Sequence, residues 1–304
     1  MMEKEWEGKR SRSSRKYLRK KKNKKFILII GAVSLLVLIM VLFHYLGIFP
    51  FSSSILSYER VNILVVGCDE VEKVSRADTI VFLSIAPKTK DALIVSIPRD
   101  TRVEIPGRGM DKINHAYAYG GIDLIKKTVG SFLDVPLHFY VIADFMDFVH
   151  VIDTLGGVEI EVEKEMHYTD KAGGFKIDLY PGKQLLNGEK ALEYVRFRQD
   201  KLGDLGRIKR QQKLALAIIN KMMKYNTFTK IPKLLAEIKD CLETDIEMQD
   251  AIALANLFNG VNQEKFKFEV IQAEPVYIGG VSYLKPDVEE VRNRIKSLIY
   301  DQNG

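Results

Sequence analysis

Acidic and basic side chains recur where apolar segments of the chain begin or end. Asp69 follows the apolar run "VNILVVG", and Asp78 opens the next run, "DTIVFLSIAP". A third run, "DALIVSIP", leads directly into Arg99 and Asp100. If the three runs are neighbouring strands of an up-and-down meander, Asp69 and Asp78 face each other at one end of a sheet. Arg99, Asp100 and Arg76 then lie at that same end.

Carboxylates beside arginines suit a particular kind of ligand. Carboxylates hold Mg²⁺ through one or two oxygens, while phosphate oxygens of a substrate complete the octahedron. Guanidinium groups match phosphate oxygens bidentately and stay charged at any ordinary pH. The pattern therefore predicts a pyrophosphate site. The competing interpretation is that these are ordinary polar turn residues, and strands that are not adjacent would separate them.

A second group of cations lies in "VRFRQDKLGDLGRIKRQQ", residues 195–212. Arg196 and Arg198 are two residues apart, so they share a face only if the chain is extended there. A helix is predicted to begin near Leu205, which places Arg207, Arg210 and Gln211 on one face of its first turns.

The apolar stripe of this predicted helix docks it on the protein: Ile208, Ala215, Ile218, Ile219 and Met222. Cations at a helix N-terminus oppose the helix dipole, but an anion bound there shares its charge with arginines and amides. We therefore expect Arg196, Arg198, Arg207 and Gln211 to face a phosphate, with Lys201 and Lys209 turned to water and Arg210 undecided. A solvated basic face is the alternative.

Net charge argues against a nucleic-acid patch. The chain of 304 residues has a formal charge of +6, but residues 1–25 hold 12 of its 46 basic and three of its 40 acidic residues. The tail is thus at +9 and the remainder at −3. The excess of basic residues is therefore confined to the tail. If a membrane segment follows the tail, these residues would determine its orientation and could contact anionic lipid.

An apolar segment follows the tail. Phe26 to Phe43 is an 18-residue run without charge, long enough to span a membrane with its flanks. A cleaved signal peptide would have a shorter apolar core followed by small residues, and here bulky residues follow. We predict a transmembrane anchor at 26–46 with the basic tail in the cytoplasm, a linker at 47–60, and one extracytoplasmic domain at 61–304.

The remaining pattern indicates an α/β fold. Helical patterns lie at about 121–134, 144–155, 188–194, 205–225, 229–241, 248–259 and 285–300, and further strands are predicted in "LHFYVIA", "GVEIEVE" and "KFKFEVI". Interleaved strands and helices favour a three-layer αβα sandwich around a mixed sheet. Cys68 and Cys241 are too few for a disulfide framework and are expected to fill space as thiols.

Several long segments resemble, in order, the motifs of the LytR–CpsA–Psr family. They are "NILVVGCDE…SRADTIVFLSIAP", "VSIPRDTRVEIPG", "KINHAYAYGG", "FVHVIDTLGGVEIEV" and "LNGEKALEYVRFRQDKLGDLGRIKRQQ", within about 61–226. In "GCDE", Cys68 replaces the small polar residue that the family usually has, and an arginine that often follows the Asp is lacking. Cys68 should point away from the site on a strand.

The resemblance implies an activity and roles for residues. Family members are membrane-anchored enzymes of Gram-positive envelopes that move a glycopolymer from a polyprenyl pyrophosphate carrier onto peptidoglycan. Asp69 and Asp78 would then hold Mg²⁺, with Mn²⁺ as a substitute, and Asp69, Asp78 and Arg99 would be catalytic. Pyrophosphate contacts would come from Arg76, Arg99, Lys112, Arg196, Arg198, Arg207 and Gln211, and Asp204 falls in a matching motif without a defined role.

The resemblance also implies a tunnel for the polyprenyl chain between sheet and helices. Its predicted lining is Phe139, Phe145, Phe148, Val149 and Ile152, for which an ordinary hydrophobic core is the alternative.

The expected reaction is attack of a muramic acid hydroxyl on the sugar-side phosphorus, with polyprenyl phosphate leaving and Asp69 or Asp100 taking the proton. The glycopolymer would be wall teichoic acid or capsular polysaccharide, and a pyrophosphatase side activity is expected. No nucleic-acid partner is expected. Two alternatives are a membrane-anchored transcriptional regulator, which would need a partner for the cytoplasmic tail, and a lipid-binding module without turnover.

Overall fold

A computed structural model describes residues 53–71, 74–170, 175–197, 199, 203–224, 230–239, 241–257, 261 and 263–300. The predicted cytoplasmic tail and transmembrane anchor, residues 1–46, lie outside this set. No helix among the described residues combines the length and the apolar character needed to cross a membrane.

A six-stranded mixed sheet forms the centre of the fold. β1 (Val61–Val71), β2 (Val74–Ala86) and β3 (Asp91–Ile97) make an antiparallel meander, which confirms the predicted adjacency of the first three apolar runs. β6 (Phe139–Ala143) lies parallel to β1, and β12 (Phe266–Val270) lies parallel to β3. The short β11 (Glu243–Thr244) completes the order β11-β6-β1-β2-β3-β12. Long β-branched runs suit these strands because helices cover both faces of the sheet.

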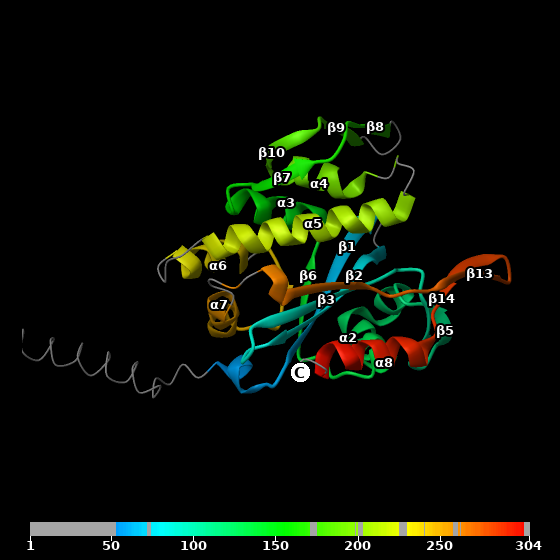
Figure 1. The fold of residues 1–304 in the computed structure, drawn as a ribbon. Helices are drawn as coiled ribbons and strands as arrows, with labels where there is room; N and C mark the ends of the chain where they lie inside the picture. Colours follow the sequence, from blue (N-terminus) through cyan, green and yellow to red (C-terminus); the bar gives the residue numbers. More distant parts are fainter. Residues whose placement is uncertain are drawn as a thin grey trace, which may run out of the picture. The chain divides into compact units, whose positions relative to one another are not determined.

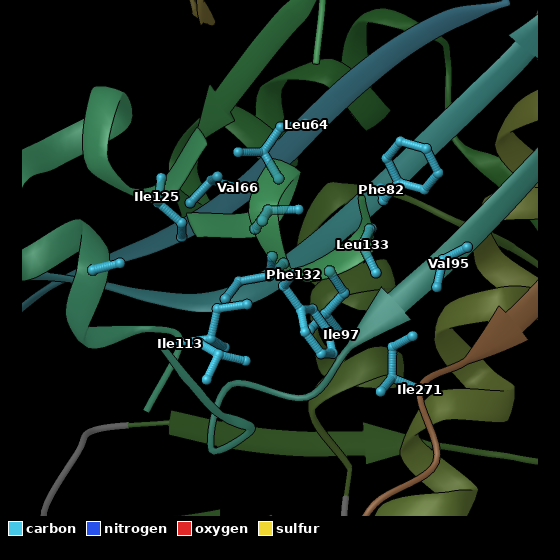
Figure 2. Close-up of a cluster of buried hydrophobic side chains, with 14 of the residues drawn as sticks. Leu64, Val66, Phe82, Val95, Ile97, Ile113, Ile125, Phe132, Leu133 and Ile271 are labelled. Carbon is cyan, nitrogen blue, oxygen red and sulfur yellow. The ribbon is translucent and has the colours of Figure 1, made fainter. Parts of the chain in front are cut away.

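One face of the sheet is covered by α2 (His115–Leu133) and α8 (Val288–Tyr300) (Figure 1). Figure 2 shows the cluster between them and the sheet, in which Leu64, Phe82 and Leu133 have no more than 2% of their surface exposed. Truncating a buried side chain of this size to alanine typically costs about 2–5 kcal/mol. This layer therefore supplies a large part of the fold's stability.

The opposite face carries α5 (Gly203–Lys224) and α7 (Met248–Leu257). Leu216 and Ile219 of α5, with Leu254 of α7, pack on a second cluster that includes Ile63 and Ile85 of the sheet. Apolar side chains thus project from both faces of the meander and pack against helices, as the predicted αβα sandwich requires.

A further unit packs against α5. It consists of α3 (Phe145–Thr154), β7 (Val158–Val162), β8 (Met166–Asp170), β9 (Phe175–Leu179), β10 (Gly182–Leu186) and α4 (Gly188–Arg196). Its own hydrophobic cluster contains the fully buried Ile152 and Tyr194 and reaches Leu214 of α5. α6 (Lys230–Lys239) contributes Leu234 and Ile238 to a smaller cluster with Leu155.

Two hairpins lie beyond the end of the meander at which Asp78 sits. β4 (Arg102–Ile105) pairs with β5 (Gly109–Lys112), and β13 (Glu274–Ile278) pairs with β14 (Val281–Lys285). Gly279 and Gly280 both have positive φ, +58° and +79°, which a two-residue hairpin turn with matching twist requires. The orange hairpin extends from the body beside β5 in Figure 1. Two short 3₁₀ turns, Ser54–Ser57 and Gln263–Lys265, complete the described elements.

The predicted elements are present with shifted ends. α2 begins at His115 rather than 121, because Gly120 and Gly121 take non-helical angles inside it and hid its first turn from the pattern. α8 begins at Val288, since Lys285 belongs to β14 and Asp287 Oδ1 accepts hydrogen bonds from the N–H groups of Glu289 and Glu290. α6 ends before Cys241, which lies half-buried in a turn, whereas Cys68 is buried in the core as expected.

Candidate functional site

The β1–β2 ladder contains a bulge where the predicted carboxylates begin. Gly67 pairs with Thr79 and Cys68 pairs with Ala77, so Asp78 is the extra residue between them. A side chain at Gly67 would come within 2.9 Å of Thr79 Cβ, and glycine thus permits this close approach. Bulges re-aim side chains and are frequent beside active sites. Here Asp78 is the bulged residue, and its carboxylate accepts a hydrogen bond from Arg99, which follows β3.

Asp78, Arg99 and Asp100 form a connected row of charges with Lys112, which we call the charged rim. Arg99 donates from Nη1 to Asp78, and its Nε lies 3.9 Å from Asp100 Oδ2. Lys112 Nζ donates to Asp100 Oδ1 at 2.6 Å. The side chains of Arg99 and Asp78 are 39% and 28% exposed, so both can reach a ligand from solvent. This confirms that the meander brings Asp78, Arg99 and Asp100 together.

Backbone hydrogen bonds fix the turn that carries Arg99. The N–H of Thr101 donates to Pro98 O at 3.0 Å, and the N–H of Asn114 donates to Arg99 O at 3.3 Å. Leu284 of β14 donates its N–H to Asp100 O at 2.9 Å. Three segments therefore hold the backbone of the rim: its own turn after β3, the residues that follow β5, and β14. Lys112 of β5 was expected at the site, whereas the contribution of β14 was not predicted, although "VYIGGVSY" carries the Gly-Gly hairpin signal.

Asp69 and Arg76 lie in the part of the β1–β2 ladder between the bulge and the hairpin turn. Their Cα atoms are partners in the ladder, and β1 and β2 stay paired as far as Val71 and Val74. The expectation that Asp69 faces Asp78 across the strands is therefore wrong, because the hairpin is longer than predicted and Arg76 takes the position opposite Asp69. The side chains of both residues lie outside what the structure describes, so their predicted roles stay predictions.

Arg196 is placed at the same end of the sheet by a different route. Ala143, the last residue of β6, pairs with Gly67 at the bulge, and Phe145 follows it as the first residue of α3. The guanidinium carbon of Arg196 lies 4.0 Å from the centre of the Phe145 ring, a close cation–π contact. Arg196, the first cation of the second group, thus lies on the β6 side of the charged rim.

The local conformation of the basic segment differs from the prediction. Arg196 is the last residue of α4, and the extended backbone begins only at Phe197. Arg196 fits this last turn, where a cation is favourable to the helix dipole, and the Phe197 N–H closes the turn by donating to Glu193 O. Arg198 and Lys201 lie outside the described residues, as does the side chain of Asp204. Arg207 and Gln211 lie half-buried on α5, and Lys209 is exposed as expected.

Arg210 is a structural residue. It is 2% exposed, and its Nη2 donates to Phe197 O at 2.6 Å while its Nη1 donates to Glu163 Oε1 at 3.2 Å. Glu163 also accepts from the hydroxyl of Tyr194, whose pKa is raised above its ordinary value by burial and then by this hydrogen bond. Arg210 therefore ties α5 to the end of α4 and to the segment after β7.

The predicted tunnel residues divide between packing clusters. Phe139 packs at the edge of the cluster under α5 and meets Tyr58 edge-on at 6.4 Å, whereas Phe148 and the fully buried Ile152 belong to the cluster of α3 and α4. Val149 is half-buried where Gly188 of α4 passes its backbone closely. These contacts are those of a packed core, and a lipid tunnel along these residues stays a prediction.

The fold is that of an α/β protein in which carboxylates and cations gather at one end of a mixed sheet. The LytR_cpsA_psr family model matches residues 9–299, and the chain therefore belongs to this family. The expected family membership is thus confirmed.

Named relatives and solved structures agree with that assignment. The chain is 36% identical to the polyisoprenyl-teichoic acid–peptidoglycan teichoic acid transferase TagU of Oceanobacillus iheyensis, over 79% of this chain and 75% of that protein. It resembles the crystal structure of Bacillus subtilis TagV with a TM-score of 0.70 and 31% identity, covering 79% and 97% of the two chains. The structure of TagT bound to LI-WTA matches with a TM-score of 0.65 and 31% identity, covering 80% and 91%.

Proposed function

We propose that this protein transfers an anionic glycopolymer of the teichoic acid class from a polyprenyl pyrophosphate carrier to a hydroxyl of peptidoglycan. The observation that carries the proposal is the charged rim, in which Asp78, Arg99, Asp100 and Lys112 are linked and partly exposed at one end of the sheet. The transferase names of the relatives support the choice of substrates.

In the proposed reaction the acceptor oxygen forms a bond to the sugar-side phosphorus. The bond from that phosphorus to the bridging oxygen breaks, and polyprenyl phosphate leaves with the electron pair. A carboxylate, either Asp100 of the rim or Asp69, takes the acceptor proton. Arg99 meets the phosphate oxygens, and Arg196, Arg198, Arg207 and Gln211 hold the second phosphate. Such transfers depend mainly on positioning and charge neutralisation, which fixed guanidinium groups provide.

A magnesium ion fits the chemistry of the rim's donors. Mg²⁺ is commonly held by one or two carboxylates together with substrate phosphates rather than by a full protein cage. Among the residues that the structure describes, no three or more His, Cys, Asp or Glu side chains are grouped so as to hold a metal. We propose Asp78 and Asp69 as its protein ligands, with Mn²⁺ as a substitute. The bound ion would neutralise charge on the pyrophosphate.

The protein is further proposed to be anchored by one transmembrane segment at 26–46, with the catalytic domain outside the cell. The 18-residue uncharged run and the basic flank before it support this topology. It places the rim on the side of the membrane where peptidoglycan lies.

The test is a transfer assay with the full chain in detergent. A polyprenyl-pyrophosphate-linked glycan and uncrosslinked peptidoglycan strands, with Mg²⁺ present, should yield a covalent glycan–peptidoglycan product and free polyprenyl phosphate. With water in place of the acceptor, slow hydrolysis should release the same lipid phosphate. Absence of product, or equal activity of Asp78→Ala and parent, would contradict the proposal.

A further inference from the structure

Two tyrosines and two arginines form a partly exposed surface immediately beside the charged rim. We call it the tyrosine face and define it by Arg102, Arg108, Tyr119 and Tyr283. The Arg102 guanidinium carbon lies 5.8 Å from the centre of the Tyr283 ring, and that of Arg108 lies 5.1 Å from the centre of the Tyr119 ring. These residues come from β4, the β4–β5 turn, α2 and β14, so only the fold assembles them.

The tyrosine face is continuous with the charged rim. Lys112, whose Nζ bonds Asp100, also lies 5.7 Å from the centre of the Tyr283 ring. β14 is fastened there by the Leu284 N–H bond to Asp100 O and by a bridge between Leu284 and Thr101. A ligand that lies on Tyr283 would therefore extend directly to the residues that surround the reacting phosphorus.

The second tyrosine is held in place by hydrogen bonds. The hydroxyl of Tyr119 donates to Asp111 Oδ2 at 2.8 Å, and His115 Nδ1 lies 2.9 Å from the same oxygen. The hydrogen bond to Asp111, then burial, raises the pKa of Tyr119, and the nearby Tyr283 phenol adds to this shift. Tyr119 is thus fixed in place and yet remains 44% exposed.

The charges of this surface favour a ligand with scattered carboxylates. Within the part of the chain that the structure describes, Arg102 and Arg108 form no ion pair with another side chain. Glu104 shares the outer side of β4 with Arg102, and Asp111 lies nearby. These two acids offset the charge of Arg102 and Arg108, so the surface carries little net charge. It suits a mostly neutral chain with occasional carboxylates better than a dense row of phosphates.

We propose that the tyrosine face binds the acceptor, a glycan strand substituted with carboxylate-bearing peptides, and guides its hydroxyl to the charged rim. Half-exposed tyrosine rings offer rigid contact area to sugar rings at low entropic cost, and their hydroxyls can exchange hydrogen bonds with sugar hydroxyls. Arg102 and Arg108 would pair with peptide carboxylates. This inference rests on the proposed transfer function, and it adds the location and chemistry of the acceptor site.

The test separates acceptor binding from donor binding. In the transfer assay with the full chain, Tyr119→Ala/Tyr283→Ala should raise the KM for peptidoglycan strands about tenfold, with kcat and the donor KM changed less than twofold. Tyr119→Phe/Tyr283→Phe keeps both rings and should lie near the parent. Tyr300→Ala, which removes a 58% exposed tyrosine from α8, is the matched control and should change nothing. Thermal unfolding checks that each variant is folded.

A second measurement needs no donor and no turnover. The parent should sediment with insoluble peptidoglycan, and the double alanine variant and Arg108→Ala should sediment several-fold less, while Tyr300→Ala matches the parent. If the parent binds peptidoglycan in this way but never transfers a glycan, the proposed function fails while the acceptor surface stands. A rise in donor KM alone, or unchanged acceptor KM and sedimentation in the double variant, would overturn the inference.

Discussion

Arg99 and Arg210 are both paired arginines near one end of the molecule, but they are built for different tasks. The side chain of Arg99 is 39% exposed, and those of its carboxylate partners Asp78 and Asp100 are 28% and 39% exposed. Arg210 is 2% exposed, and it bonds a backbone carbonyl in addition to Glu163. An exposed ion pair can exchange one partner for a ligand at a small cost in free energy. Moving a buried arginine away would leave buried polar groups without hydrogen-bond partners. Exposure rather than residue type distinguishes the site from the scaffold.

The largest expected effect comes from removing the site arginine. Arg99→Ala should lower the transfer rate about 10²–10³-fold, as loss of one fixed charge-stabilising donor commonly does, because the reacting phosphate loses its guanidinium. The free energy of unfolding should change by less than about 1 kcal/mol, since the ion pair is solvent-screened. Steady-state kinetics and urea unfolding measure the two quantities.

The matched control for Arg99 is Arg294→Ala on α8. Arg294 is 58% exposed and pairs with Glu269 at 3.1 Å, outside the rim. It should leave both the rate and the stability near those of the parent. If Arg99→Ala loses stability but keeps its activity, the assignment of Arg99 to the site is wrong.

The scaffold arginine should show the opposite profile. Arg210→Met should lower the free energy of unfolding by about 2–4 kcal/mol, because Phe197 O loses its buried donor and Glu163 loses its charge partner. The neighbouring Lys209 is exposed, and Lys209→Met should cost less than about 0.5 kcal/mol. Urea unfolding of the two variants side by side decides the matter. If Arg210→Met and Lys209→Met were equally stable, the structural role of Arg210 would be contradicted.

A smaller effect is expected where Arg196 lies on an aromatic ring. Phe145→Leu removes the cation–π contact, worth about 1 kcal/mol, and should lower the transfer rate about fivefold because Arg196 is less well positioned. Phe145→Tyr keeps a ring and should stay within about twofold of the parent. Transfer kinetics at saturating acceptor measure both, and an unchanged rate in Phe145→Leu would argue that Arg196 acts independently of the ring.

The smallest effect concerns pH and lies away from the rim. Burial, aided by the charge of Lys126, lowers the pKa of His138 below its ordinary value, and neutral Nδ1 accepts a hydrogen bond from the N–H of Asn62 at 2.9 Å. Well above pH 6.5 the folded and unfolded chains both keep this imidazole neutral. As the pH falls, the unfolded chain takes up the proton first, so stability is lost, by less than about 1.4 kcal/mol per pH unit for one proton.

Substitution of His138 isolates this contribution. His138→Phe keeps a ring beside Tyr58, which lies 4.2 Å from the His138 ring, and should be less stable than the parent at pH 7.5. The difference in free energy of unfolding should shrink between pH 6.5 and 5, because the unfolded parent takes up a proton there before the folded parent does. A parent–variant gap that is the same at every pH would refute the shift.

Much of the site follows from the sequence because its parts are close along the chain. The three apolar runs are joined by short connections, so an antiparallel meander is their simplest arrangement, and this brings Asp78 beside Arg99 and Asp100. The family motifs point to the same residues and to Lys112. The alternation of strand and helix patterns likewise predicts a mixed sheet between helical layers.

Only the tertiary structure determined the features that depend on strand register and on which helix and sheet faces pack together. Helical spacing places Arg207, Arg210 and Gln211 on one side of α5, but only docking on β7 and α4 buries Arg210 against Glu163. The bulge at Asp78 and the pairing of Asp69 with Arg76 are set by how two strands align, which no local pattern specifies. The tyrosine face joins residues from β4, α2 and β14 that are as far apart in sequence as Arg102 and Tyr283. Local propensity fixes elements, whereas contacts between distant segments depend on the packing of the whole chain.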